Sequence, residues 1–196
     1  NTEGMYKGIE REENGVAIAE RHISEKASRR LAEFTYKYAR ENNRKRVTVV
    51  HKANVLRKTC GLFRRTVLSV SEKFPDIETE EVIVDAMAMR LIKEPERFDV
   101  VITTNLFGDI LSDEASQLVG GLGIAPSGNI GEKSGLFEPV HGSAPKYAGK
   151  DIANPTATFL SAAMMLDFLG EKKEGDRIRN SIFKTFAEGK RTKDLG

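Results

Sequence analysis

Residues 98–115 read FDVVITTNLFGDILSDEA, a β-branched run that passes directly into a helical pattern. Residues 98–103 are typical of a buried strand, because β-branched and aromatic side chains pack well on a pleated surface. We expect a helix to start at Gly108 and Asp109 and to run to about Val119. A strand followed at once by a helix predicts the α/β class.

The residues before this stretch show the same alternation of strands and helices. Ser24 is a typical N-cap for a helix that reaches Asn42. The spacing of four, three and four predicts that this helix buries one face, formed by Ala27, Leu31, Phe34 and Tyr38. Further expected elements are a strand over 47–50, a helix over 62–74 and a strand over 82–84.

Turn-forming residues divide the chain into two parts. Asn14-Gly15 predicts the turn of a hairpin or arm, and a glycine-rich stretch over 120–131 separates the first part from the second. Asn154-Pro155 is a good helix start, and Gly170 is a natural end for that helix. A last amphipathic helix stops at Gly189. We expect residues 1–119 to form one domain, with an arm near 1–23, and residues 120–196 to belong to another.

Composition excludes several functional classes. The 31 basic and 29 acidic side chains leave a formal net charge of +2, which predicts neither a nucleic-acid nor an anionic-membrane partner. No apolar run approaches the roughly 20 residues of a membrane-spanning helix. The lone Cys60 excludes an internal disulfide framework and fits a reducing, cytoplasmic location. Because both ends look cut, we expect these 196 residues to belong to a longer chain.

Three aspartates form a candidate metal site. Asp109 and Asp113 lie four residues apart, so both carboxylates fall on one helix face. Asp85 ends the expected strand over 82–84, and ligands of open α/β sheets bind at the carboxyl ends of strands. Hard oxygen ligands select Mg²⁺ or Mn²⁺. The alternative is a solvated helix start, where acidic residues are favoured by the helix dipole.

Lys52 and Tyr6 are candidate proton-transfer groups. A lysine that emerges from a buried strand can act as a base, although its ammonium can equally reach water beyond a packed stem. Tyr6 could be a phenolic acid or a half-buried structural residue. The loop over 141–145 could approach a phosphate closely, and Lys146-Tyr147 would suit a nucleotide, but a turn and a surface pair explain both equally well.

Several other sites are excluded by their missing signatures. The three histidines and Cys60 lack metal-ligand spacing, and neither a nucleophile elbow nor a P-loop occurs. Pro126 stands where a dinucleotide-binding fingerprint beginning at Gly121 would need its last glycine, so an ordinary Rossmann site is unsupported.

Six stretches together resemble the metal-dependent β-decarboxylating dehydrogenases, which include the isocitrate, homoisocitrate and 3-isopropylmalate dehydrogenases. They are, in family order, NTEGMY (1–6), HKANVL (51–56), VDAMAM (84–89), NLFGDILSDEA (105–115), FEPVHGSAP (137–145) and ANPTA (153–157). The resemblance covers essentially the whole chain, and residues 105–115 are its most specific part.

The resemblance implies a role for each candidate residue. Asp109 and Asp113 would bind Mg²⁺ or Mn²⁺ together with the equivalent of Asp85 from a partner subunit. Tyr6 and Lys52 would be catalytic, Lys52 acting across the dimer interface. Asp85 would contact the substrate, and Asn54 would contact the substrate or the nicotinamide. The implied residues for NAD or NADP are Glu138, His141, Gly142, Ser143, Ala144, Pro145, Lys146, Tyr147, Asn154 and Asp194.

The resemblance also implies a fold and a reaction. The fold would be the two-domain isopropylmalate dehydrogenase-like α/β fold, here the smaller dimerising domain plus the C-terminal half of the larger cofactor domain. A 2-hydroxy acid with a 3-carboxylate would chelate the metal and pass hydride to NAD(P). Lys52 would help remove the hydroxyl proton, the β-carboxylate would leave as CO₂, and Tyr6 would act as the acid.

Substrate and cofactor remain open at this point. Residues 126–131 and 192–196 look closest to isocitrate enzymes, whereas residues 84–89 look as much like isopropylmalate enzymes. Lys146 favours NADP, but Lys193 stands where NADP relatives offer a second tyrosine. A non-catalytic regulatory subunit and a dimerisation module are the alternatives of another class. Regulatory subunits tend to lose catalytic acids. This chain keeps all five candidate catalytic and metal-binding side chains, which favours a catalytic chain; they are Tyr6, Lys52, Asp85, Asp109 and Asp113.

Overall fold

The computed structural model describes residues 3–196 and divides into two compact units between Glu114 and Ala115. Asn1 and Thr2, the first residues of the expected arm and of the NTEGMY stretch, lie outside the described residues. The boundary falls inside helix α4 (Asn105–Leu118), close to the division that we expect near Gly120. The roles of the two parts stay predictions, and each unit is described by itself.

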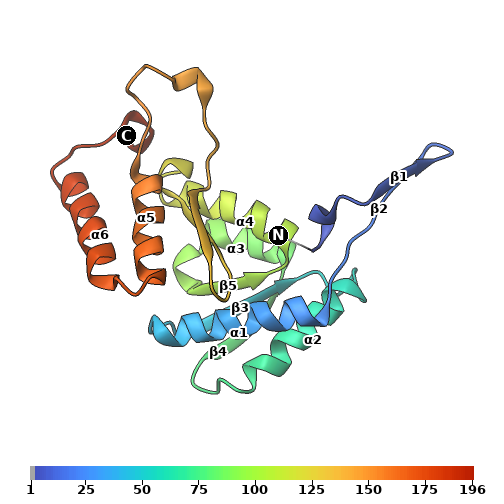
Figure 1. The fold of residues 1–196 in the computed structure, drawn as a ribbon. Helices are drawn as coiled ribbons and strands as arrows, with labels where there is room; N and C mark the ends of the chain where they lie inside the picture. The colour runs from blue at the N-terminus through green and yellow to red at the C-terminus, as the bar shows by residue number, and fades with distance from the viewer. Residues whose placement is uncertain (1–2) are drawn as a thin grey trace. The chain divides into compact units, whose positions relative to one another are not determined.

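The first unit is built on a parallel sheet in the order β4-β3-β5 (Figure 1). Its strands are β3 (Arg46–His51), β4 (Glu78–Ile83) and β5 (Val100–Thr103). Val50 lies opposite Val82 on one side and Thr103 on the other. Because the strands are parallel, all three carboxyl ends meet at one edge of the sheet, where ligands of such sheets bind.

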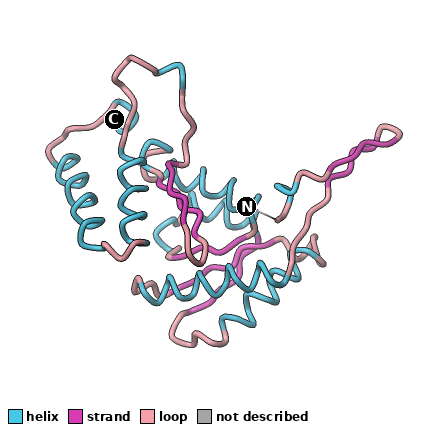
Figure 2. Tube along the Cα trace, in the orientation of Figure 1, coloured by secondary structure: helices cyan, strands magenta, loops and turns pink. Residues whose placement is uncertain are grey.

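Helices cover both faces of this sheet. The helices α1 (Glu25–Glu41) and α2 (Thr59–Ser71) pack on one face. The helices α3 (Val84–Lys93) and α4 pack on the other (Figures 1 and 2). Alternate residues of β3 serve the two layers, since Val47 and Val49 join the α1–α2 core while Val50 joins the α3–α4 core. The α/β class is therefore confirmed.

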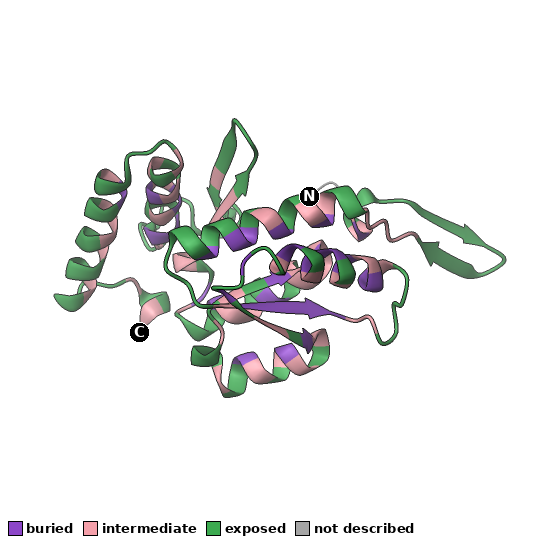
Figure 3. Cartoon of the chain, turned by 90° about the horizontal axis from the view of Figure 1, so that it is seen from below, coloured by how far each residue is buried: buried purple, intermediate pink, exposed green. Residues whose placement is uncertain are grey.

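The central strand β3 is the part of the sheet that reads as an apolar, β-branched run. Five of the six residues of β3 are buried. Buried residues are drawn in purple in Figure 3. A strand covered on both faces needs no polar alternation, so residues 47–50 are apolar or β-branched throughout.

The expected buried face of α1 is wrong. Ser24 does cap the helix, accepting a hydrogen bond from the Ala27 amide at 3.2 Å. However, Leu31, Phe34 and Tyr38 are exposed. The buried face instead consists of Ser28, Ala32, Thr35, Tyr36 and Ala39. These residues follow the same helical spacing, and their smaller side chains let α1 approach α2 and the sheet closely, while Tyr36 fills the remaining space.

This difference predicts unequal stability effects for two tyrosines of the same helix. Tyr36 is fully buried, stacks on Phe74 and hydrogen-bonds Thr79 Oγ1 at 2.8 Å, whereas Tyr38 is 44% exposed. We expect Tyr36→Ala to cost about 3–5 kcal/mol of unfolding free energy and Tyr38→Ala about 0.5 kcal/mol. Urea unfolding measures both changes in unfolding free energy. Equal losses in the two variants would support the buried face that the spacing predicted.

A second difference concerns residues 84–93, where the expected strand gives way to a helix. The strand β4 ends at Ile83 and α3 begins with Val84, so Asp85 lies in the first helical turn rather than on the strand. An acidic residue in a first turn is favoured by the helix dipole, and alanine and methionine favour helix. These two features of the sequence could have predicted α3.

The arm is a hairpin of β1 (Glu10–Glu13) and β2 (Val16–Ala19). Asn14 and Gly15 both have positive φ, as the two-residue turn requires, which confirms the Asn-Gly signal. All eight strand residues are exposed, and Figure 1 shows the hairpin reaching away from the sheet of its unit. A short 3₁₀ turn, η1 (Met5–Lys7), precedes it.

The second unit combines a hairpin with two helices. The hairpin β6 (Pro126–Ile130) and β7 (Gly135–Pro139) packs on α5 (Thr156–Phe168), which packs in turn on α6 (Lys172–Ala187). The glycine-rich stretch thus includes a strand that the sequence did not predict. Asn154 Oδ1 accepts from the Thr156 amide at 3.0 Å, as expected for a helix start. The other short 3₁₀ helices of the described residues are η2 (Pro95–Arg97), η3 (Leu122–Ile124), η4 (Pro145–Tyr147) and η5 (Lys193–Leu195).

Over residues 3–196, no helix combines the length and apolarity needed to cross a lipid bilayer.

Candidate functional site

The candidate catalytic residues follow the three strands at their common edge. Lys52 comes directly after β3, Asp85 lies one residue into the helix that follows β4, and Asp109 and Asp113 lie on the helix that follows β5. The parallel pairing therefore gathers residues that are up to 61 positions apart, as expected for side chains at the carboxyl ends of neighbouring strands.

Lys52 and Asp85 form one pair of this edge. Lys52 Nζ donates to Asp85 Oδ1 at 2.5 Å, and the side chains are 24% and 61% exposed respectively. The hydrogen bond from the ammonium is the main reason that the pKa of Asp85 lies below its usual value. Lys52 thus meets a counter-charge rather than open water. Asn54, two residues further on, is exposed.

Tyr6 and Asp109 form a second pair. The Tyr6 hydroxyl donates to Asp109 Oδ2, and the ring is 46% exposed. This hydrogen bond is the main cause that raises the pKa of Tyr6, and the charges of Asp109 and Asp113 add to it because they oppose a phenolate. Tyr6 is thereby kept as a proton donor beside two carboxylates.

The segment before Tyr6 is fixed by hydrogen bonds within the first unit. Glu3 accepts from the Ser24 amide at 2.9 Å, and the Gly4 amide donates to the His22 carbonyl at 2.7 Å. Asn105 Nδ2 donates to the Glu3 carbonyl at 3.3 Å. Gly4 has φ +80°, a conformation that a side chain would strain, so glycine is needed at this turn.

Arg21 ties the end of the arm to the start of α4. Its guanidinium donates to Thr104 Oγ1 at 2.6 Å and to Cys60 Sγ at 3.3 Å, and lies 4.7 Å from the centre of the Phe107 ring. The chain on both sides of Tyr6 is therefore anchored next to the helix that carries Asp109. The sequence reasoning assigned no role to Glu3, although it lies in the NTEGMY stretch, and it missed Arg21, which belongs to no recognisable motif.

The three candidate metal ligands do not form one cluster in a single chain. Within residues 3–196, no group of three or more His, Cys, Asp or Glu side chains is placed to hold a metal ion. Asp109 and Asp113 offer two hard oxygen donors one helical turn apart, which fits Mg²⁺ or Mn²⁺ but leaves the ligand set incomplete. A third carboxylate from another chain is consistent with this arrangement.

The candidate cofactor residues belong to the second unit. Residues 142–150 form an exposed loop in which Ala144 is left-handed, and Lys146 Nζ lies 5.0 Å from the centre of the Tyr147 ring.

His141 Nδ1 donates to the Gly142 carbonyl at 2.8 Å, and its buried Nε2 has no hydrogen-bond partner among the described residues. An orphaned buried acceptor and an open small-residue loop fit a polar ligand. Glu138 precedes the loop on β7.

Asn154 and Asp194 meet although they are 40 residues apart. Asn154 Nδ2 donates to Asp194 Oδ2 at 2.9 Å. A Cβ at Gly123 would lie 2.5 Å from Asp194 Oδ2 and 3.1 Å from Asn154 Nδ2, so only glycine leaves room for this pair. The glycine-rich stretch thus contributes to the candidate cofactor region through its lack of side chains.

Comparison with known proteins shows the family of this chain. The sequence pattern of the isocitrate/isopropylmalate dehydrogenase family matches residues 1–196. The chain belongs to this family. It is 57% identical to homoisocitrate dehydrogenase of Methanocaldococcus jannaschii over 196 residues and 53% identical to 3-isopropylmalate dehydrogenase of Methanothermobacter thermautotrophicus over 196 residues. All of the chain is covered in both matches, against 56% and 60% of the relatives.

A solved structure confirms the isocitrate/isopropylmalate dehydrogenase fold. The crystal structure of isocitrate dehydrogenase from Methylococcus capsulatus matches with a TM-score of 0.95 and 46% identity, covering 100% of this chain and 60% of that one. The chain thus spans about 60% or less of the length of these family members.

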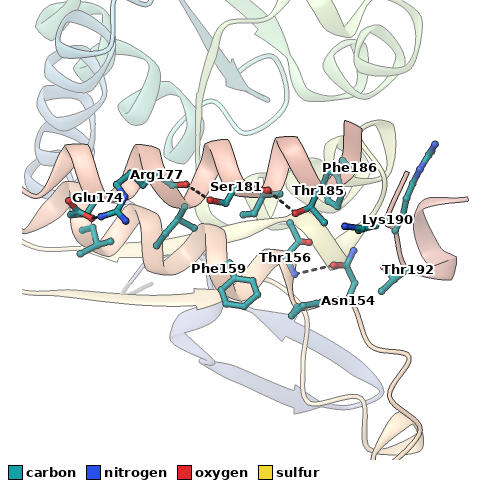
Figure 4. Close-up of a pocket in the computed structure, with 15 residues that line it drawn as sticks. Asn154, Thr156, Phe159, Glu174, Arg177, Ser181, Thr185, Phe186, Lys190 and Thr192 are labelled. Carbon is teal, nitrogen blue, oxygen red and sulfur yellow. Dashed lines mark hydrogen bonds and ion pairs between the residues drawn. The ribbon is translucent and has the colours of Figure 1, made fainter. Parts of the chain in front are cut away.

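The second unit contains a cavity of about 700 Å³ that most of the candidate cofactor residues do not line. It is lined by residues of α5, α6 and the C-terminal segment, which Figure 4 shows together with the Ser181–Arg177 and Thr185–Ser181 hydrogen bonds. Of the ten candidate cofactor residues, only Asn154 lines it. The apolar part of its wall consists of Pro155, Phe159, Leu166, Ile178, Ile182 and Phe186.

Proposed function

We propose that the full-length protein oxidises and decarboxylates a 2-hydroxy acid that carries a 3-carboxylate, with NAD or NADP as the hydride acceptor and Mg²⁺ or Mn²⁺ as the metal. Family membership supports this class of reaction. The observation that carries the proposal is the pairing of Lys52 with Asp85 and of Tyr6 with Asp109 at one edge of a parallel sheet.

The proposed roles follow from the chemistry of these side chains. Lys52 accepts the proton of the substrate hydroxyl once it has given up its own, and Asp85 holds its amine in place. Tyr6 delivers a proton to the carbon that loses CO₂, since its raised pKa keeps the phenol protonated. A divalent ion held by Asp109 and Asp113 would polarise the substrate oxygen as a Lewis acid. We expect Asn54 to orient the substrate.

We further propose a homodimer, or a higher homo-oligomer, in which each active site uses two subunits. Among the described residues of one chain, Asp85 does not join Asp109 and Asp113 in a group that could hold a metal ion, so the metal ligand set is incomplete. The arm has eight exposed strand residues, and a two-stranded hairpin is at best marginal without further packing. Met89, Ile92 and Ile110 on α3 and α4 are exposed, as an apolar interface would require. A reducing compartment such as the cytosol suits the single buried thiol of Cys60.

The function is tested by assaying the full-length protein with isocitrate, homoisocitrate and 3-isopropylmalate. We expect reduction of NAD(P) that needs Mg²⁺ or Mn²⁺, with isocitrate favoured because of residues 126–131 and 192–196. The relatives that match carry all three substrate names, so the panel decides among them. Absence of turnover with every substrate, in a folded dimer, would favour the regulatory subunit or dimerisation module.

Lys146 is proposed to favour NADP. Its ammonium lies beside the Tyr147 ring in the open loop, where it can pair with a 2′-phosphate. We expect Lys146→Asp to lower kcat/KM for NADP about tenfold or more and to change that for NAD by less than threefold, because a carboxylate repels the phosphate. Steady-state kinetics with both cofactors measures this, with the exposed Lys150→Asp as the control. A strong NAD preference that Lys146→Asp leaves unchanged would contradict it.

A further inference from the structure

His51, the residue before Lys52, is a buried side chain that hydrogen-bonds to the partly exposed Glu81–Arg64 pair, and the proposed mechanism does not use it. It is the last residue of β3 and only 6% exposed. The Ala53 amide donates to His51 Nδ1 at 3.2 Å. A backbone amide can only donate, so Nδ1 carries no proton, and in a neutral ring the proton is on Nε2. His51 Nε2 then donates to Glu81 Oε2 at 3.2 Å.

Glu81 holds this tautomer because it is itself fixed. It lies on β4, and Arg64 of α2 donates to both of its carboxylate oxygens, through Nη2 to Oε1 at 2.8 Å and through Nε to Oε2. The Arg64 hydrogen bond is the main cause that holds the pKa of Glu81 below its usual value against the effect of burial. Glu81 therefore stays an acceptor and keeps the proton of His51 on Nε2.

The network acts on the peptide bond between Lys52 and Ala53. The carbonyl of this peptide accepts from the Val55 amide at 3.1 Å and the Leu56 amide at 2.8 Å, and its N–H is bonded to His51 Nδ1. Both polar atoms of one peptide plane are thus satisfied on opposite edges. The orientation of this plane sets the direction in which the Lys52 side chain leaves the backbone toward Asp85.

We propose that His51 is a positioning residue for Lys52, acting through the Ala53 amide, with Glu81 and Arg64 fixing its tautomer. This rests on the proposed function, in which Lys52 transfers the hydroxyl proton. A catalytic lysine held within a fraction of an ångström reacts faster than one that samples several directions. A buried histidine with a purely structural role would affect stability without any special effect on kcat.

Two substitutions of His51 separate its two nitrogens. Asparagine can place Oδ1 where Nδ1 lies and still accept from Ala53, whereas glutamine can reach Glu81 but offers no atom at the Nδ1 position. In the full-length protein we expect His51→Gln to lower kcat about 10–100-fold at nearly unchanged substrate KM, and His51→Asn to restore most of that loss. Val49→Ala, a buried change two residues earlier, should lower Tm while kcat is kept.

Hydrogen exchange of the Ala53 amide gives a readout that needs no turnover. We expect slow exchange in the wild type and in His51→Asn, and faster exchange in His51→Gln. Equal losses of kcat in His51→Gln and His51→Asn would overturn the proposal. So would a loss of kcat in Val49→Ala that matches its loss of Tm, since stability alone would then explain the effect. Fast exchange of the Ala53 amide in the wild type would overturn it as well. A wild type without turnover would instead contradict the proposed function, and the exchange data would still decide whether His51 holds the peptide.

Discussion

Lys52→Met in the full-length protein is expected to lower kcat by about 10²–10⁴-fold, the range that a positioned general acid or base contributes. The reason is the geometry of the pair: Lys52 Nζ lies 2.5 Å from Asp85 Oδ1, on a side chain that leaves a fixed peptide. Methionine keeps the length of the stem and removes the amine. Steady-state kinetics with saturating metal measures the loss.

The variant Lys52→Arg distinguishes a lysine that transfers a proton from one that only supplies a positive charge. Arginine keeps the positive charge and can still pair with Asp85, but it does not deprotonate in proteins. We expect it to be nearly as slow as Lys52→Met. Near wild-type kcat in Lys52→Arg would limit Lys52 to an electrostatic role. Lys37→Met, at an exposed lysine on α1, serves as the matched control and should change kcat by less than twofold.

Asp109→Asn is expected to lower kcat by about 10³-fold and to weaken Mn²⁺ binding by at least about 100-fold, because it removes one of two carboxylates on the α4 face. The amide also replaces the charge that accepts the Tyr6 hydroxyl. Isothermal titration with Mn²⁺ in the presence of substrate measures the binding. Glu114→Gln changes a carboxylate of the same helix outside the four-residue spacing and should leave affinity unchanged. Intact Mn²⁺ dependence in Asp109→Asn would refute the metal assignment.

The two variants together test whether the active site is shared. If Lys52 and Asp85 serve the site that contains Asp109 and Tyr6 of the other subunit, a mixed dimer keeps one site with both native residues. Random exchange between the Lys52→Met and Asp109→Asn proteins makes half of the dimers mixed, so we expect about a quarter of wild-type activity. Sites contained within one subunit would leave the mixture as inactive as its components.

Local chemistry was sufficient for much of this molecule. The β-branched runs over 47–50 and 98–103, the Ser24 cap and the Asn14-Gly15 turn each act within a few residues, and all of them appear in the structure close to where they were expected. Residues 84–93 show the limit of this reasoning, because Val82 to Val84 look like one strand until α3 begins inside the run. The face of α1 shows another, since two helical stripes have apolar residues and only packing decides which is covered.

The amino-acid sequence alone determined the α/β class, the family and the side chains Tyr6, Lys52, Asp85, Asp109 and Asp113 as candidates, because residue type and spacing are local properties. The tertiary structure alone decided which of them meet. Lys52 pairs with Asp85, 33 residues on, because β3 and β4 are parallel neighbours, and Tyr6 meets Asp109 across 103 residues. The contact of His51 with Glu81 arises in the same way, since strand order brings together residues that no sequence period connects.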